Sequence, residues 1–102
     1  MNAVSKLVNR VGESIVAYIT GATDRSLVTK WVDGTATPDI DQLEAIVFTN
    51  LVFEQIATVS SGETARAFLI DQMDDGTSPI AAIREGRTNT VQAHKRRFLD
   101  GE

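Results

Sequence analysis

Side chains that could carry catalysis or bind a metal ion are few in this chain. It contains no cysteine and one histidine, His94, which lies in a basic stretch typical of a protein surface. Asp71, Asp74 and Asp75 precede Gly76 like part of a calcium loop, but the spacing is wrong and no glutamate follows at the twelfth position. Neither a phosphate-binding glycine loop nor a nucleophile elbow is present. We therefore expect a binding protein that needs no cofactor or metal, and not an enzyme.

The strongest chemical signal is a short polar segment suited to DNA bases. Arg25 carries a guanidinium that can pair with guanine, and the side chains of Ser26 and Thr29 are short enough for close approach. Lys30 would lie near the phosphate backbone. Thr23 and the free amides at the start of a helix could hold a phosphate group.

This polar segment lies in a pattern that predicts a helix-turn-helix. Ala17 and Gly21 are four residues apart on a segment that predicts a helix over residues 13–20. A polar turn follows, and then a second helix over residues 24–32 with Trp31 as an anchor in the core. The alternative is a plain helical packing unit of the same geometry that binds no DNA.

Apolar spacing and capping residues predict further helices, and strand signals are nearly absent, so the expected fold class is all-α. Beside the two helices above, we expect one over residues 3–11 and a long one over 38–59, with Thr37 as N-cap. A further helix runs from a Ser60–Glu63 capping box to a break at Asp75-Gly76, with Met73 on its apolar face. Two more are expected over 79–86, after Ser78, and near the C-terminal end, where Asn89 with Gln92 forms the cap.

The helix over residues 38–59 is predicted to be central because its apolar arc is unusually wide. Such an arc indicates burial on more than one side. One stripe consists of Ile40, Leu43, Val47 and Leu51, and Ile46, Phe53 and Ile56 widen it.

Length and composition indicate a single domain of 102 residues with 42% apolar residues. Within it we distinguish a helix-turn-helix region (1–38), the central helix (39–59) and a C-terminal region (60–102). We find no signal-peptide pattern, and no apolar run approaches the ~18 residues of a membrane span. The expected location is therefore cytoplasmic, with no membrane partner.

The net charge of -4 is unevenly distributed. Residues 1–34 carry four basic and three acidic side chains, whereas residues 35–80 carry one basic and eight acidic ones. Residues 81–102 carry five basic and three acidic side chains. The acidic excess thus lies away from the predicted helix-turn-helix, either as a solvated face or as a surface for a basic protein partner.

Most of the chain resembles the Xre/MbcA/ParS-type antitoxins, especially short actinobacterial and phage-type members. The N-terminal part of the resemblance lies in residues 21–25, Lys30-Trp31 and Thr37-Pro38. The C-terminal part lies in residues 65–70, 77–80 and 82–87, with Val91 and Phe98. Many members have a tryptophan where this chain has Phe68, which is a departure from the pattern.

The resemblance implies a DNA-binding regulator that represses its own operon and neutralises a RES-type toxin, an enzyme that degrades NAD. Its DNA side would be Arg25, Ser26, Thr29 and Lys30. Its toxin side would include Ser78, Arg84, Arg87, Arg96 and Arg97. Alternatives are a stand-alone, phage-type or Cro-like repressor, and a protein-interaction module whose helix-turn-helix binds no DNA.

A homodimer is expected on physical grounds as well. One helix-turn-helix with few cations binds DNA weakly, and a two-fold dimer would place two recognition helices about 34 Å apart. Lys6 and Arg10 could add contacts to the DNA backbone. Val91, Phe98 and Leu99 in the last helix are candidate dimer contacts, unless they close the core of the monomer.

Overall fold

The computed structural model describes residues 2–73 and 75–100, and this part of the chain folds into seven α-helices without a strand. The all-α fold class is thereby confirmed. The helices are α1 (Ala3–Val11), α2 (Glu13–Thr20), α3 (Arg25–Asp33), α4 (Ile40–Val59), α5 (Gly62–Ile70), α6 (Pro79–Arg84) and α7 (Thr88–Leu99).

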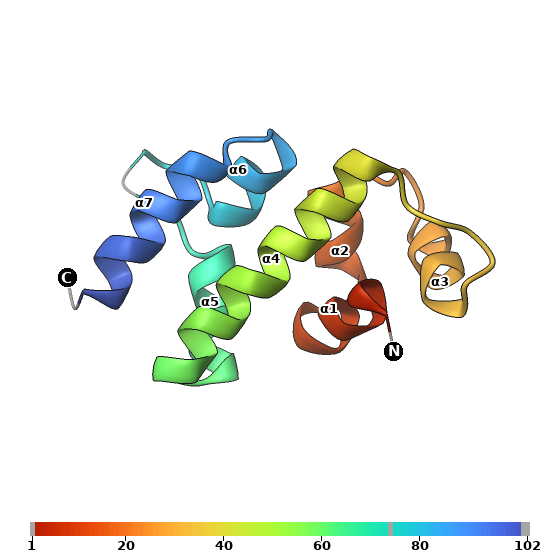
Figure 1. Ribbon diagram of the computed structural model, residues 1–102. Helices are drawn as coiled ribbons and strands as arrows, with labels where there is room; N and C mark the ends of the chain where they lie inside the picture. The colour runs from red at the N-terminus through yellow and green to blue at the C-terminus, as the bar shows by residue number, and fades with distance from the viewer. Residues whose placement is uncertain (1, 74, 101–102) are drawn as a thin grey trace.

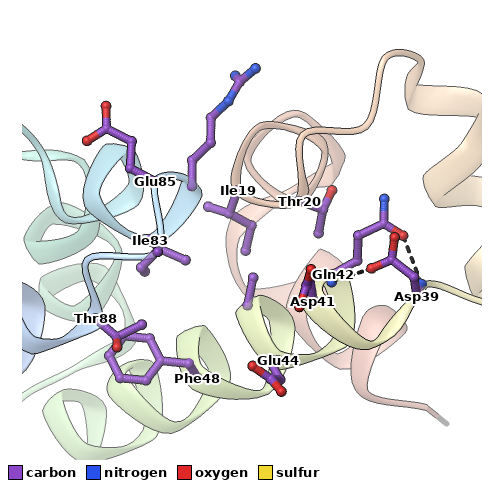
Figure 2. A pocket seen from close by; sticks show the side chains of 13 residues that line it. Ile19, Thr20, Asp39, Asp41, Gln42, Glu44, Phe48, Ile83, Glu85 and Thr88 are labelled. Carbon is purple, nitrogen blue, oxygen red and sulfur yellow. Dashed lines mark hydrogen bonds between the residues drawn. The ribbon is translucent and has the colours of Figure 1, made fainter.

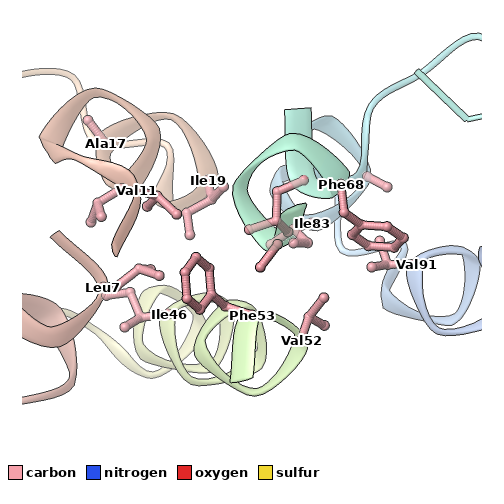
Figure 3. Packing of buried hydrophobic residues seen from close by; sticks show 14 of the residues in the cluster. Leu7, Val11, Ala17, Ile19, Ile46, Val52, Phe53, Phe68, Ile83 and Val91 are labelled. Carbon is pink, nitrogen blue, oxygen red and sulfur yellow. The ribbon is translucent and has the colours of Figure 1, made fainter. Parts of the chain in front are cut away.

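Helix α4 is the central element, as predicted, although only one of its two apolar faces is buried. It runs diagonally across the molecule and packs against every other helix except α3 (Figure 1). In Figure 3, side chains from α1 and α2 on one side and from α5, α6 and α7 on the other converge on those of α4. Ile46 and Ile56 are fully buried, and Phe53 is nearly so. A single core therefore joins the two halves of the chain.

The first three helices have almost the bounds that the sequence predicted. The N–H of Gly21, which ends α2, bonds to carbonyl groups of its last turn. Its φ of 71° is a left-handed conformation that favours glycine. Val28 and Trp31 are buried and Leu27 is half-buried, so the predicted inner face of α3 is confirmed.

Three predicted helix starts are wrong by one or two residues. Asp39 caps α4 in a capping box with Gln42, so Thr37 and Pro38 precede the helix. Ser61, whose side chain accepts from the amide of Thr64, caps α5 in place of Ser60. Helix α7 starts at Thr88, so the predicted cap Asn89 lies inside its first turn.

The predicted surroundings of Met73 and His94 need correction, and for Val91 and Phe98 the second of the two predicted roles is the one found. Helix α5 ends at Ile70, and Met73 is buried in the loop that follows. The ring of His94 is half-buried and stacks on Phe68 at 5.0 Å, so this histidine is not a free surface residue. Val91 is buried and Phe98 packs edge-on against Phe68, so these two predicted dimer contacts close the monomer core.

The largest correction concerns the outer stripe of α4. Its four side chains were expected to be buried, yet their exposed fractions are 74% for Ile40, 41% for Leu43, 45% for Val47 and 49% for Leu51. At 100° per residue this stripe lies opposite Ile46, Phe53 and Ile56, which face the core. Helix α4 is therefore apolar on two opposite faces, and the chain covers only one.

No helix in the described part of the chain combines the length and apolar character that crossing a membrane requires.

Candidate nucleic-acid interface

Helix α3 lies at one end of an elongated molecule whose principal extents are 43 × 24 × 19 Å (Figure 1). It packs on α1 and α2 and on no other helix of the described residues. Val28 and Trp31 hold its inner face, and the side-chain amide of Asn2 donates to the carbonyl of Trp31 at 3.1 Å. These contacts fix which face of α3 points to solvent.

All five predicted DNA-contacting residues are exposed. Arg25, Ser26, Thr29 and Lys30 lie on α3, and Thr23 precedes its cap. Positions 25, 26 and 29 are neighbours on a helix surface because residues three and four apart share a face. The structure thus brings these short and basic side chains onto one uncovered surface.

Arg25 extends toward the start of α2. Its Nη1 donates to Oγ of Ser14 at 3.4 Å, a long and exposed hydrogen bond. Such a bond costs little to break, because both groups exchange it for contacts with water or a ligand. The guanidinium therefore remains accessible to a partner.

The start of α3 is less suited to phosphate than the sequence suggested. The carboxylate of Asp24 accepts from the amide of Ser26 at 2.9 Å and so occupies one of the free helix amides. Hydrogen bonds from the backbone and side chain of Ser26 lower the pKa of Asp24, with smaller contributions from the charges of Lys30 and Arg25. An ionised carboxylate at this position repels a phosphate. The sequence prediction assigned the free amides at this helix start to a phosphate and overlooked the carboxylate of Asp24.

Lys6 and Arg10 were expected to reach the DNA backbone but are ion-paired with α4. The Nζ of Lys6 and Nη2 of Arg10 lie 2.9 Å and 3.0 Å from Oε1 of Glu54. Hydrogen bonds from Lys6 and then Arg10 lower the pKa of Glu54. Arg10 also lies 5.0 Å above the ring of Phe53. Both cations therefore hold α1 against α4.

Ser78 and Arg87, two of the residues predicted to bind a protein partner, make contacts near α6 that stabilise the fold. The Oγ of Ser78 accepts from the amide of Ala81 at 3.2 Å and caps α6. Arg87 pairs with Glu85 at 2.8 Å and with Asp75 at 3.5 Å, linking the end of α6 to the preceding loop. These contacts raise the pKa of Arg87, with Glu85 as the main cause.

The three remaining arginines lie at two places. The guanidinium of Arg84 lies 4.8 Å above the ring of Tyr18 and ties α6 to α2. Arg96 and Arg97 are exposed in the last turn of α7, at the end of the molecule opposite α3 (Figure 1). The predicted DNA side and this part of the predicted partner side are therefore far apart.

A cleft of about 690 Å³ lies between α2, the start of α4 and α6 (Figure 2). Four carboxylates line it: Asp39, Asp41, Glu44 and Glu85. Its charge is opposite to that required for nucleic acid. Among the described residues, no three His, Cys, Asp or Glu side chains are grouped so that they could hold a metal ion. Sequence reasoning located the acidic excess of this region but not the cleft.

Comparison of the chain with protein-family models, curated proteins and solved structures gave no match. The resemblance to Xre-like antitoxins therefore stays a hypothesis drawn from the sequence, and the functional conclusion rests on the surface chemistry of α3.

Proposed function

We propose that this protein is a DNA-binding regulator that inserts α3 into the major groove and represses its own operon. The observation that supports this most directly is the uncovered polar face of α3, which carries Arg25, Ser26, Thr29 and Lys30. Its opposite face is anchored by Val28 and Trp31. The major groove of DNA, about 12 Å wide, admits an α-helix presented in this way.

In this proposal Arg25 reads a guanine, because a guanidinium pairs with the O6 and N7 acceptors of that base. Ser26 and Thr29 allow the helix to approach the base edges closely. Lys30, in the last turn of α3, contacts the phosphate backbone. Thr23, beside the Asp24 cap, contributes a hydroxyl to the backbone at the other end of the helix.

Charge limits the affinity of a single copy. The chain has a net charge of -4, and Asp24 and Asp33 flank the basic residues of α3. Since each neutralised phosphate contributes to affinity through counterion release, two cations per copy give weak binding. A two-fold dimer would double the contacts, and the operator would then be a palindrome.

Neutralisation of a toxin protein is a second candidate function. The observation that favours it is the distance between α3 and the exposed Arg96 and Arg97, which lie at opposite ends of the long axis (Figure 1). One copy could bind DNA and a partner protein at once without competition. An acidic surface on the partner would complement these two arginines.

DNA binding is tested by fluorescence anisotropy with duplex DNA from directly upstream of the gene, and with a scrambled duplex as control. We expect tighter binding to the upstream DNA, with an affinity that falls steeply as salt is raised. Arg25→Ala should reduce the preference by roughly tenfold, since one bidentate base contact is worth about 1–3 kcal/mol.

Arg96→Ala is the matched control, because it removes the same charge at the opposite end of the molecule. It should leave the sequence preference unchanged. Equal binding of the upstream and scrambled duplexes at low salt would refute the proposal and leave α3 as scaffold.

The second candidate is tested by co-expression with the protein encoded by the adjacent gene and by affinity capture. Recovery of that protein with the wild type but not with the Arg96→Glu/Arg97→Glu variant would support it. If the wild type and the variant both capture the protein, Arg96 and Arg97 are not part of the interface.

A further inference from the structure

Helix α4 carries an apolar surface that the chain itself leaves uncovered. The outer stripe, defined as Ile40, Leu43, Val47 and Leu51, is between 41% and 74% exposed. Together with Glu44 and Phe48 it lines a shallow groove of about 380 Å³. Glu44 is the only charged side chain in that lining. A contiguous apolar patch of this kind is typical of an interaction site.

We propose that the outer stripe pairs with the same stripe of a second copy, with the two α4 helices antiparallel. This inference rests on α4 and its immediate surroundings and does not depend on DNA binding by α3. Three features of the described residues favour a second copy over another occupant.

The spacing of the stripe is nearly self-complementary. Its residues are separated by three, four and four positions along roughly 16 Å of helix. A two-fold axis at the middle of the stripe places Ile40 opposite Leu51 of the other copy, and Leu43 within one residue, about 1.5 Å, of Val47. Each apolar side chain thus meets an apolar side chain, as an isologous interface requires.

The shape of the surface fits this antiparallel pairing. Ile40 is the most exposed member of the stripe at 74% and protrudes at one end. At the other end a hollow of about 360 Å³ lies between α1 and α4, lined by Val47, Leu51 and Asn50 among others. Antiparallel pairing brings Ile40 of each copy to the hollow beside Leu51 of the other.

Charge favours the antiparallel direction. Asp39, Asp41 and Glu44 surround the first turns of α4. The cations that contact this helix lie toward its other end: Lys6 and Arg10 bind Glu54, and Lys95 donates to the side chain of Gln55. These three cations outnumber the one carboxylate of Glu54, so antiparallel pairing places the acidic end of one helix against a net positive end of the other. Parallel pairing would place three carboxylates against three carboxylates.

The first test is the oligomeric state of the full chain, measured by analytical ultracentrifugation over a range of micromolar concentrations. We expect a monomer–dimer equilibrium for the wild type. Val47→Glu should raise its dissociation constant by roughly a hundredfold, or about 2.8 kcal/mol, because the new carboxylate would be buried beside Glu44 of the other copy.

Val59→Glu is the matched control. Val59 is 70% exposed on the same helix but lies beyond the outer stripe, so this variant should dimerise like the wild type. Circular dichroism should show that both variants keep their helices. A wild type that stays monomeric at the highest concentration, or a Val47→Glu variant that associates like the wild type, would overturn the proposal.

The direction of pairing is tested by disulfide trapping, which the absence of native cysteine allows. On oxidation, a mixture of Ile40→Cys and Leu51→Cys proteins should cross-link chiefly to the mixed dimer. Cross-linking of Ile40→Cys to itself in preference would indicate parallel helices and contradict the antiparallel arrangement.

Discussion

Arg10 and Asn50 form a polar link between the first helix and the central one, beside the ion pairs with Glu54. The Nη1 of Arg10 donates to Oδ1 of Asn50 at 3.0 Å, and the amide of Asn50 donates to the carbonyl of Ala3 at 3.1 Å. Asn50 is only 8% exposed. The side chain thus satisfies both its donor and its acceptor at the boundary of an otherwise apolar core.

Asn50→Ala should therefore lower the free energy of unfolding by about 1–3 kcal/mol, since it removes the two hydrogen bonds that the side chain makes with Arg10 and Ala3. Urea unfolding followed by circular dichroism measures the change. Asn9→Ala, an exposed change on α1, is the control and should stay within about 0.5 kcal/mol of the wild type. Equal stability of the two variants would show that the link contributes nothing.

A pair of glycine substitutions should act in opposite directions. A methyl group added to Gly21 would have open space around it, but the φ of 71° means that Gly21→Ala introduces backbone strain of about 1–2 kcal/mol. Gly62 is the first residue of α5, and an added Cβ would contact the ring of Phe53 at 3.6 Å. Gly62→Ala should stabilise the protein by about 0.4–1 kcal/mol. Thermal unfolding of both variants measures the difference, and a stabilised Gly21→Ala would contradict the turn geometry.

Asp24 should contribute to the acid sensitivity of the fold. Its pKa is lowered from 3.8 in the folded state, chiefly by the backbone hydrogen bond from Ser26. A carboxyl with a depressed folded pKa stabilises the protein above its unfolded pKa of about 3.9, and this contribution is lost as the pH falls through the folded value.

Asp24→Asn keeps a capping side chain but cannot titrate. The stability of this variant should fall less steeply than that of the wild type below about pH 4. The two proteins should differ by less than one in the number of protons taken up on unfolding. Urea unfolding at a series of acidic pH values tests this. Identical slopes would mean that the cap exerts no electrostatic effect.

Tyr18 and Arg84 should be energetically coupled. The guanidinium lies 4.8 Å above the ring at a partly exposed site, and such pairs are worth about 0.5–1 kcal/mol. A double-mutant cycle with Tyr18→Leu and Arg84→Ala should give a coupling energy of that size. In a control cycle, Tyr18→Leu is combined with Arg66→Ala, which removes an arginine of α5, and no coupling is expected. Equal coupling in the two cycles would exclude a specific contact.

Several helix bounds could be predicted because the local sequence has one clear solution. Gly12 and Gly21 end α1 and α2, and no neighbouring residue competes with them. The predicted caps failed where two candidates lie close together. Thr37 and Asp39 both precede the long helix, and Ser60 and Ser61 both precede α5. The spacing of Asp39 and Gln42 is itself a capping-box pattern, so that cap was overlooked, whereas the Ser60–Glu63 pattern predicted the start of α5 one residue too early.

The exposure of the candidate site's side chains could be predicted from the sequence, but their contacts could not. The exposure of Arg25 and Lys30 follows from the helical period once Trp31 is assigned to the core. The ion pairs of Arg10 with Glu54 and of Arg87 with Asp75 join residues distant in sequence, so spacing gave no sign of them. Likewise, the period of α4 reveals two apolar faces but cannot say that the fold covers only the one that bears Ile46.

Trp31 gives this protein a built-in optical probe of the segment proposed to read DNA. It is the only tryptophan in the chain, is 2% exposed and belongs to α3. Its emission wavelength therefore reports whether that helix is seated, whereas the far-ultraviolet signal averages over all helices. Helix α3 packs on α1 and α2 alone among the described helices. During gradual unfolding, a red shift of the emission before ellipticity is lost would therefore show that α3 detaches while the other helices remain folded.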